Sequence, residues 1–76
     1  MSPRMPQVTA RELVAFLRKH GFVDHRQSGS HLSLRHPLTG KTVTVAIHMG
    51  ADVGRGLAVR ILKSAGFSVE DFIRLR

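Results

Sequence analysis

The chain has 76 residues, of which 42% are hydrophobic, so it is long enough for one small domain but leaves little room for a deep pocket beside its core. Twelve lysines and arginines against five acidic residues give a formal net charge of +7, which favours a polyanionic partner such as nucleic acid or an acidic protein. The absence of cysteine excludes disulfides and thiolate metal sites, and no apolar run approaches the ~20 residues of a membrane-spanning helix. We therefore expect a cytoplasmic protein that does not bind membranes.

The first predicted element is a helix that begins after Thr9 and ends at Gly21. Thr9 and Glu12 form the T-x-x-E pattern of a capping box, and apolar residues follow at helical spacing. A glycine at the far end is typical of a helix stop. We assign residues 1–7 to a flexible leader and residues 8–76 to a single domain.

Three short strands are predicted next, over residues 22–27, 31–36 and 42–48. In the second, Leu32 and Leu34 alternate with polar residues, so the apolar and polar sets lie on opposite faces of the strand. The third strand alternates in the same way. The connections are short, which favours an antiparallel meander.

Two helices complete the chain. The first covers residues 57–65, has an apolar stripe that includes Leu57, and ends at Gly66; the second is short and begins after Ser68. The resulting order is α-β-β-β-α with an extra C-terminal helix. We predict the α+β class, with a three-stranded antiparallel sheet that has its helices on one face and leaves the other face open to solvent.

His31 is the candidate for chemistry. It follows Gly29 and Ser30 and shares the polar face of its strand with Ser33 and Arg35. The Arg35 guanidinium could hold a phosphate next to His31. An imidazole can accept or donate a proton near neutral pH. From the residues alone, a solvated surface histidine remains an open alternative.

The other histidines are interpreted as structural or solvated residues. His20 closes the first helix, whereas His25 and His36 are read as solvated strand residues. His31 and His36 are five residues apart on one strand and face opposite ways, so a zinc site is not expected.

The aromatic residues indicate how a nucleic acid would be bound. Tyrosine and tryptophan are absent, and the pattern assigns all four phenylalanines to the core, so no platform remains for stacked bases. Binding should depend on phosphate, shape and ribose hydroxyls. The glycine-rich segment 50–56 lacks the P-loop pattern and is read as a crossover, with an anion contact at Arg55 as the alternative.

An ordered set of segments resembles the HicA-type (YcfA-like) toxins of bacterial type II toxin–antitoxin systems. The segments are LRKHGF, RQSGSH, HPLTGKTVTV, IHMG and LAVRILKSAGFSVEDF. The resemblance implies a fold like a double-stranded-RNA-binding domain, an mRNA interferase activity, and a HicB-type antitoxin that covers the active face. The family's catalytic histidine, in its G-[ST]-H motif, falls on His31. Many members have a second histidine where this chain has Leu32, so a paired-histidine mechanism is not expected.

We therefore predict a metal-independent endoribonuclease toxin, without a cofactor, that cleaves mRNA or other RNA and inhibits translation, with His31 as general acid/base. The second proton carrier is open, and His48 is one candidate. No DNA binding is expected from this chain alone. The predicted RNA contacts are Arg26, Ser30, Ser33, Arg35, Lys41, His48 and Arg55. Two alternatives remain: a non-catalytic RNA-binding module of the same shape, and a protein whose basic face docks an acidic antitoxin.

Overall fold

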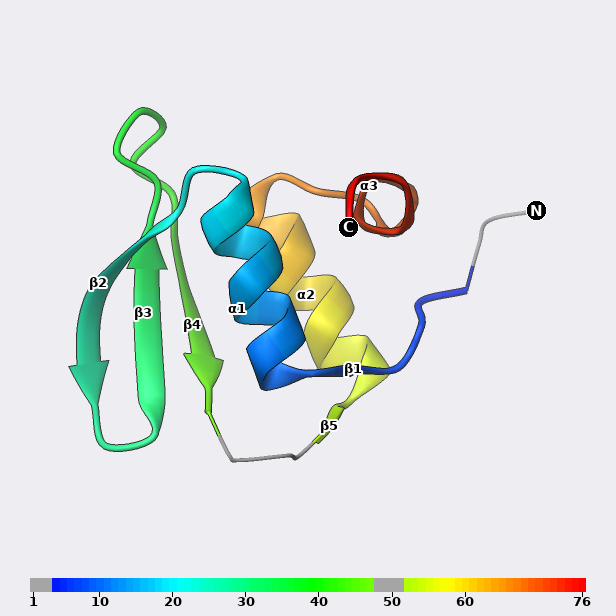
Figure 1. Ribbon diagram of the computed structural model, residues 1–76, viewed down its shortest axis with the longest axis horizontal. Helices are drawn as coiled ribbons and strands as arrows, with labels where there is room; N and C mark the ends of the chain where they lie inside the picture. Colours follow the sequence, from blue (N-terminus) through cyan, green and yellow to red (C-terminus); the bar gives the residue numbers. More distant parts are fainter. Residues whose placement is uncertain (1–3, 48–51) are drawn as a thin grey trace.

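The computed structural model describes residues 4–47 and 52–76 of the chain, and Figure 1 shows the arrangement of its elements. These are β1 (Val8–Thr9), α1 (Ala10–Lys19), β2 (Val23–Ser28), β3 (His31–Arg35), β4 (Thr42–Ala46), β5 (Asp52–Val53), α2 (Arg55–Ala65) and α3 (Val69–Leu75). The series α1-β2-β3-β4-α2 is the predicted order of a double-stranded-RNA-binding domain, and α3 is the predicted extra helix. Within the described segments, no helix is long and apolar enough to cross a membrane.

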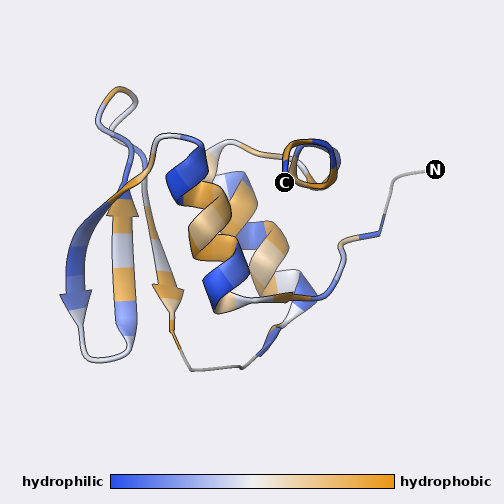
Figure 2. Ribbon diagram, in the orientation of Figure 1, coloured by the Kyte–Doolittle hydropathy of each residue, from blue (hydrophilic) through white to orange (hydrophobic). Residues whose placement is uncertain are grey.

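The main sheet is antiparallel with the strand order β2-β3-β4, as the short connections predicted. Leu32 pairs with Val45 and Leu34 with Val43, and all four side chains are buried on the face covered by the helices. The alternation of apolar and polar residues along β3 is visible in Figure 2. The strand β2 lies at the edge of the sheet away from the helices (Figure 1), and all six of its residues are exposed.

Helix α1 begins with the predicted capping box. The Thr9 hydroxyl accepts from the Glu12 amide at 3.1 Å, and the Glu12 carboxylate accepts from the Thr9 amide at 3.0 Å. These bonds satisfy two amides that have no partner inside the helix. The hydrogen bond from the Thr9 backbone lowers the pKa of Glu12.

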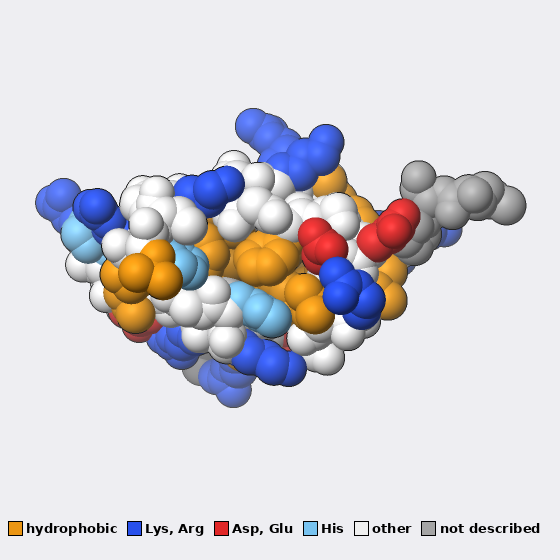
Figure 3. Space-filling model, turned by 90° about the horizontal axis from the view of Figure 1, so that it is seen from above, with side chains coloured by type: hydrophobic (Ala, Val, Ile, Leu, Met, Phe, Trp, Pro, Cys, Tyr) orange, Lys and Arg blue, Asp and Glu red, His pale blue; other side chains and the backbone are white. Residues whose placement is uncertain are grey.

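Helices α1 and α2 end in the same way. Gly21 and Gly66 both have φ of +95°. In each case the glycine amide and the following amide donate back to carbonyls of the last helical turn, which is the Schellman arrangement. Both glycines lie at the end of the molecule that carries the β3–β4 hairpin and α3. Figure 3 views this end, where histidine and hydrophobic side chains lie together with lysine and arginine around them.

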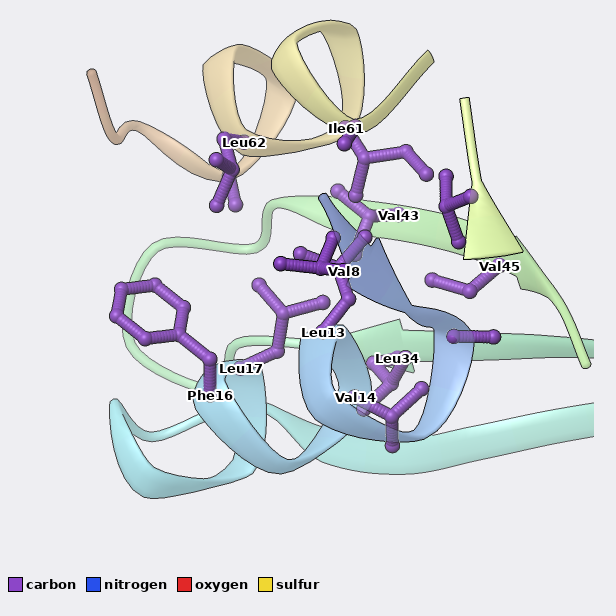
Figure 4. Close-up of a cluster of buried hydrophobic side chains, with 14 of the residues drawn as sticks. Val8, Leu13, Val14, Phe16, Leu17, Leu34, Val43, Val45, Ile61 and Leu62 are labelled. Carbon is purple, nitrogen blue, oxygen red and sulfur yellow. The ribbon is translucent and has the colours of Figure 1, made fainter. Parts of the chain in front are cut away.

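The core lies between the sheet and the two long helices, and Figure 4 shows side chains from α1, β3, β4 and α2 converging there. Leu13, Leu17, Leu34 and Leu62 are completely buried. Burying each such side chain stabilises the fold by roughly 1.5–3 kcal/mol. The Phe16 ring lies 4.8 Å from the Phe72 ring, edge-on, and so attaches α3 to α1.

Three features differ from the sequence predictions. A short antiparallel pair, β1–β5, joins Val8 to Val53, and the alternation did not reveal it. Met5 is only 5% exposed and packs in the core, so the segment expected to be a flexible leader contributes to the domain. Leu57, which was assigned to the inner stripe of its helix, is instead 50% exposed.

Candidate nucleic-acid interface

The open face of the sheet, here called the wet face, consists of three rows of paired residues. Read from β2 across β3 to β4, the rows are Ser28–His31–Ala46, Arg26–Ser33–Thr44 and Val23–Arg35–Thr42. Directly paired residues share a face, with Cβ atoms about 4.5–5.5 Å apart. Because His31 lies in the row next to Arg26 and Ser33, the register brings these three predicted site residues together.

A two-residue turn presents His31 at the beginning of β3. Gly29 has φ of +59°, and Ser30 does not have a positive φ. This is the pattern of a type II′ hairpin turn, in which glycine takes the first central position. The Ser30 carbonyl accepts a hydrogen bond from the Ile47 amide. The main chain on both sides of His31 is therefore held by the sheet.

The surroundings of His31 leave its ring open to a ligand. The side chain is exposed, and its two row partners, Ser28 and Ala46, are small. No side-chain hydrogen bond to its imidazole occurs within the described residues. The neighbouring Leu32 points the other way and is 3% exposed, so it could not place a second group beside His31 on the wet face.

A β-bulge at His25 puts Asp24 and Arg26 on opposite faces of β2. On a regular strand these two residues would share a face, but the register shifts between them. Arg26 joins Ser33 on the wet face, whereas Asp24 faces the helices. There the Arg18 guanidinium donates to the Asp24 carboxylate at 2.9 and 2.7 Å, and these bonds lower the pKa of Asp24. The bulge thus keeps a negative charge away from Arg26, the arginine in the row next to His31.

The wet face is positively charged. Its three rows contain two arginines and His31 but no carboxylate. Three of the five acidic residues of the chain are paired with arginines on other surfaces. These are Asp24 with Arg18, Asp71 with Arg74 and Glu12 with Arg76.

Hydroxyl groups occupy the middle of the wet face. The Ser33 and Thr44 side-chain oxygens are 3.0 Å apart and hydrogen-bond across β3 and β4. A hydroxyl can donate one hydrogen bond and accept two, so this pair retains capacity for phosphate or ribose oxygens.

Arg35 lies at the opposite end of β3 from His31. The two residues are four positions apart, which corresponds to roughly 13 Å along a strand. Arg26, in the row next to His31, is therefore the closer of the two arginines, and contact of Arg35 with a phosphate stays a prediction. The Arg35 side chain reaches toward the β3–β4 hairpin. If Gly40 carried a Cβ atom, the Arg35 Nη2 would lie 3.9 Å from it.

Two other predicted contacts lie away from the wet face. Lys41 lies at the C-terminal end of α2, where the helix dipole favours a cation. If Gly66 carried a Cβ atom, the Lys41 Nζ would be 3.2 Å from it. The Arg55 Nε donates to the Met5 carbonyl at 3.0 Å and ties the N-terminal segment to the start of α2. His48 lies outside the described residues.

Two histidines have structural positions. His36 is half-buried, which corrects the expectation of a solvated strand residue. Its Nδ1 accepts from the amides of Leu38 at 3.2 Å and Thr39 at 3.4 Å, which fixes the ring against the hairpin. His20 occupies the C-cap of α1 as predicted, and its ring packs 4.5 Å from Phe16.

The arrangement suits phosphate binding next to a proton-carrying group. In the described part of the chain, no group of three or more histidines or acidic residues is placed to hold a metal ion. The wet face offers an imidazole, hydroxyls and guanidinium groups. These are the groups that bind a phosphodiester and move protons around it.

Comparison with protein families gives a match to a toxin family. The family model described as "HicA toxin of bacterial toxin-antitoxin" matches residues 10–67, which include α1, the three-stranded sheet and α2. The matched range contains all nine residues of the wet-face rows. A search of curated proteins found no match.

Proposed function

Since the chain belongs to the HicA toxin family of bacterial toxin–antitoxin systems, we propose that it is an endoribonuclease that cleaves mRNA and thereby inhibits translation. The observation that carries this proposal is the wet face. An exposed imidazole, His31, lies one row from Arg26 in a surface whose three rows contain no carboxylate. Such a surface attracts the phosphate backbone and places a general acid/base beside it.

The reaction uses a nucleophile that RNA itself provides. His31 accepts the proton of a ribose 2′-hydroxyl, and the 2′-oxygen attacks the adjacent phosphorus. The bond from phosphorus to the 5′-oxygen breaks, and that oxygen takes a proton from water or from a second acid. The products are a 2′,3′-cyclic phosphate and a 5′-hydroxyl.

The other wet-face residues bind and orient the phosphodiester. Arg26 donates to the non-bridging oxygens and stabilises the negative charge that develops on them in the transition state. The hydroxyls of Ser33 and Thr44 lie in the same row and can contact the phosphate or the ribose. Arg35, at the other end of β3, would bind a neighbouring phosphate farther along the strand.

The partner that regulates the toxin is proposed to be a HicB-type antitoxin, which binds in the cytoplasm and blocks access of RNA to the wet face. The charge supports this proposal, because a surface that attracts RNA also attracts an acidic protein. RNA and the antitoxin should then compete for this face.

The chemistry is tested with short RNA substrates in EDTA. An RNA that is cleaved at a defined position is compared with the same RNA containing a single 2′-deoxyribose at that position. We expect the substitution to abolish cleavage there, because it removes the nucleophile, and we expect a cyclic phosphate on the product of the unmodified RNA. Cleavage of the deoxy-substituted bond, or of an all-DNA substrate, would contradict the mechanism.

Binding measurements separate the catalytic proposal from a non-catalytic RNA-binding module. A module of the same shape would bind RNA with a steep salt dependence but leave it intact. A protein that only docks an acidic antitoxin would not bind RNA at physiological salt.

A further inference from the structure

The outer edge of β4 is open. This strand is the last in the order β2-β3-β4, and no strand of residues 4–47 or 52–76 pairs with its outer side. Its five residues pair with β3 without a register shift, whereas the other edge strand, β2, contains a bulge. Bulges disfavour the pairing of an edge with a further strand, so β4 is the edge better suited to accept one.

The hydrogen-bonding pattern shows which groups face outward. The Ile47 amide donates to the Ser30 carbonyl on the β3 side. Along an antiparallel strand, successive residues alternate between bonding to the partner and pointing away from it. Counting back from Ile47, the backbone groups of Thr42 and Thr44 point away from β3. Each offers one amide donor and one carbonyl acceptor to an added strand.

A groove runs along this open edge. A hollow of about 220 Å³ separates β4 from α2. Its lining consists of Thr42, Val43 and Thr44 on one side and Leu57, Arg60, Ile61 and Ser64 on the other. A second hollow, of about 130 Å³, continues past Leu57 toward Val45 and Ala46. The groove therefore follows most of the strand, with a helix as its opposite wall.

Leu57 supplies the apolar contact of the groove. It lines both hollows and is 50% exposed, whereas Ile61 behind it is 7% exposed. An apolar side chain placed in the groove would cover the exposed part of Leu57, and burying apolar surface is favourable by about 25 cal/mol per Å². The groove thus combines an unpaired strand edge with an apolar wall, as in domains that bind peptides by strand addition.

The charge on both sides of β4 defines the chemistry of the occupant: Arg26 and Arg35 lie in the rows of the wet face, and α2 lies on the other side. Between residues 55 and 65 the helix has three cations and no acidic residue. Arg60 lies in the groove wall itself. An occupant with carboxylates is therefore favoured. The alternating amides and carbonyls of an extended peptide match the outward donors and acceptors of Thr42 and Thr44 better than RNA does, because RNA phosphates only accept hydrogen bonds.

We propose that an extended segment of a partner protein, with alternating acidic and apolar side chains, binds in the groove between β4 and α2 as a fourth strand of the sheet. Residues opposite Thr42 and Thr44 would place acidic side chains on the wet face, and the residues between them would pack apolar side chains against Leu57. The segment would bring negative charge beside the row of Arg26 and so oppose RNA binding. Only the identification of this partner as the antitoxin rests on the proposed function.

The test uses a synthetic peptide of alternating glutamate and valine, acetylated and amidated at its ends. Amide hydrogen exchange is followed by NMR with and without the peptide. At about ten times its Kd, the peptide should slow exchange at Thr42 and Thr44 by about tenfold, because only the unbound fraction exchanges. The amides of Val43 and Val45 already bond to β3 and should change little, so they are an internal control.

Variants and control peptides test the binding mode. Leu57→Ser and Arg60→Glu should each weaken peptide binding by about tenfold, the effect of losing one good contact. Leu38→Ser, which alters a leucine that is 90% exposed on the β3–β4 hairpin, should not change it. A peptide N-methylated at the amides that face β4 should not bind, and neither should a scrambled peptide of the same composition.

Several results would overturn the proposal. These are unchanged exchange at Thr42 and Thr44 with saturating peptide, equal binding of the N-methylated peptide, and no detectable binding. Slow exchange at both amides in a concentrated sample without peptide, together with dimer formation, would assign the groove to a second copy of the chain. The proposed function is tested independently, because peptide binding does not depend on His31: His31→Ala should retain it.

Discussion

The two glycines that end α1 and α2 allow the energetic effect of the contact with His36 to be measured separately. Gly21 and Gly66 have the same φ of +95° and the same Schellman arrangement, but their surroundings differ. A Cβ atom at Gly21 would lie 2.7 Å from the His36 Nε2, whereas at Gly66 the nearest atom would be the tip of Lys41, at 3.2 Å. Carbon atoms in ordinary contact are ~3.5–4.0 Å apart, so the imidazole must move to accept the methyl group.

The magnitudes follow from these surroundings. Alanine in the left-handed region costs about 1–2 kcal/mol, and this cost is common to both sites. The lysine tip can swing away, so Gly66→Ala should lose only that amount. The His36 ring is held by two backbone amides and packs edge-on against Phe22 at 5.2 Å. Moving it weakens two hydrogen bonds worth about 0.5–1.5 kcal/mol each, so Gly21→Ala should cost an additional 1–3 kcal/mol or so.

Urea unfolding of both variants measures the difference, and thermal unfolding should show Gly21→Ala melting at least about 4–8 °C below Gly66→Ala. In a His36→Ala background the obstacle is absent, so the additional cost of Gly21→Ala should disappear. Equal losses for the two variants in the wild-type background would refute the view that His36 is fixed in place as a structural residue.

Three further predictions concern the core, the acid response and the RNA surface. Leu34→Ala should lower the free energy of unfolding by about 2–5 kcal/mol in urea titrations, and a loss below about 1 kcal/mol would contradict its complete burial. The Arg18 hydrogen bond lowers the pKa of Asp24 in the folded state, so this pair stabilises the protein at neutral pH and the stabilisation is lost as the pH falls through the lowered pKa. In a plot of urea midpoint against pH, Asp24→Asn should therefore reduce the fall in stability on the acid side. An unchanged fall would count against a stabilising pair. Arg26→Ala should weaken RNA binding and reduce the slope of log affinity against log salt by about 1, whereas Lys41→Ala should do less; equal effects would place RNA elsewhere.

Much of the fold was predictable because it is encoded in local patterns. The capping pairs that begin α1 and α3 and the glycines that end α1 and α2 act within a few residues of chain. The alternation in β3 and β4 reflects the burial of one face, and it correctly placed His31 and Leu32 on opposite sides. These signals do not depend on distant partners, so the sequence alone was sufficient.

The remaining features depend on contacts between distant segments. All residues of β2 are exposed, so no burial pattern marked the bulge that turns Arg26 to the wet face. Met5 is held by a core that α1 and α2 complete, and Arg55 binds its carbonyl across 50 residues of sequence. His36 lies in an alternating segment, but its role follows from the hairpin that it closes. None of these relations has a periodicity that could be read from the chain.

The most direct test of the account is the rate of RNA cleavage by His31→Ala in EDTA, measured with the RNA affinity of the same preparation. We expect the rate to fall by about 100-fold to 10,000-fold, the usual contribution of a general acid/base, while RNA affinity changes little. The 2′,3′-cyclic phosphate product of the wild-type protein should decline in parallel. Cleavage by His31→Ala at the wild-type rate would contradict the central claim that this imidazole moves the proton.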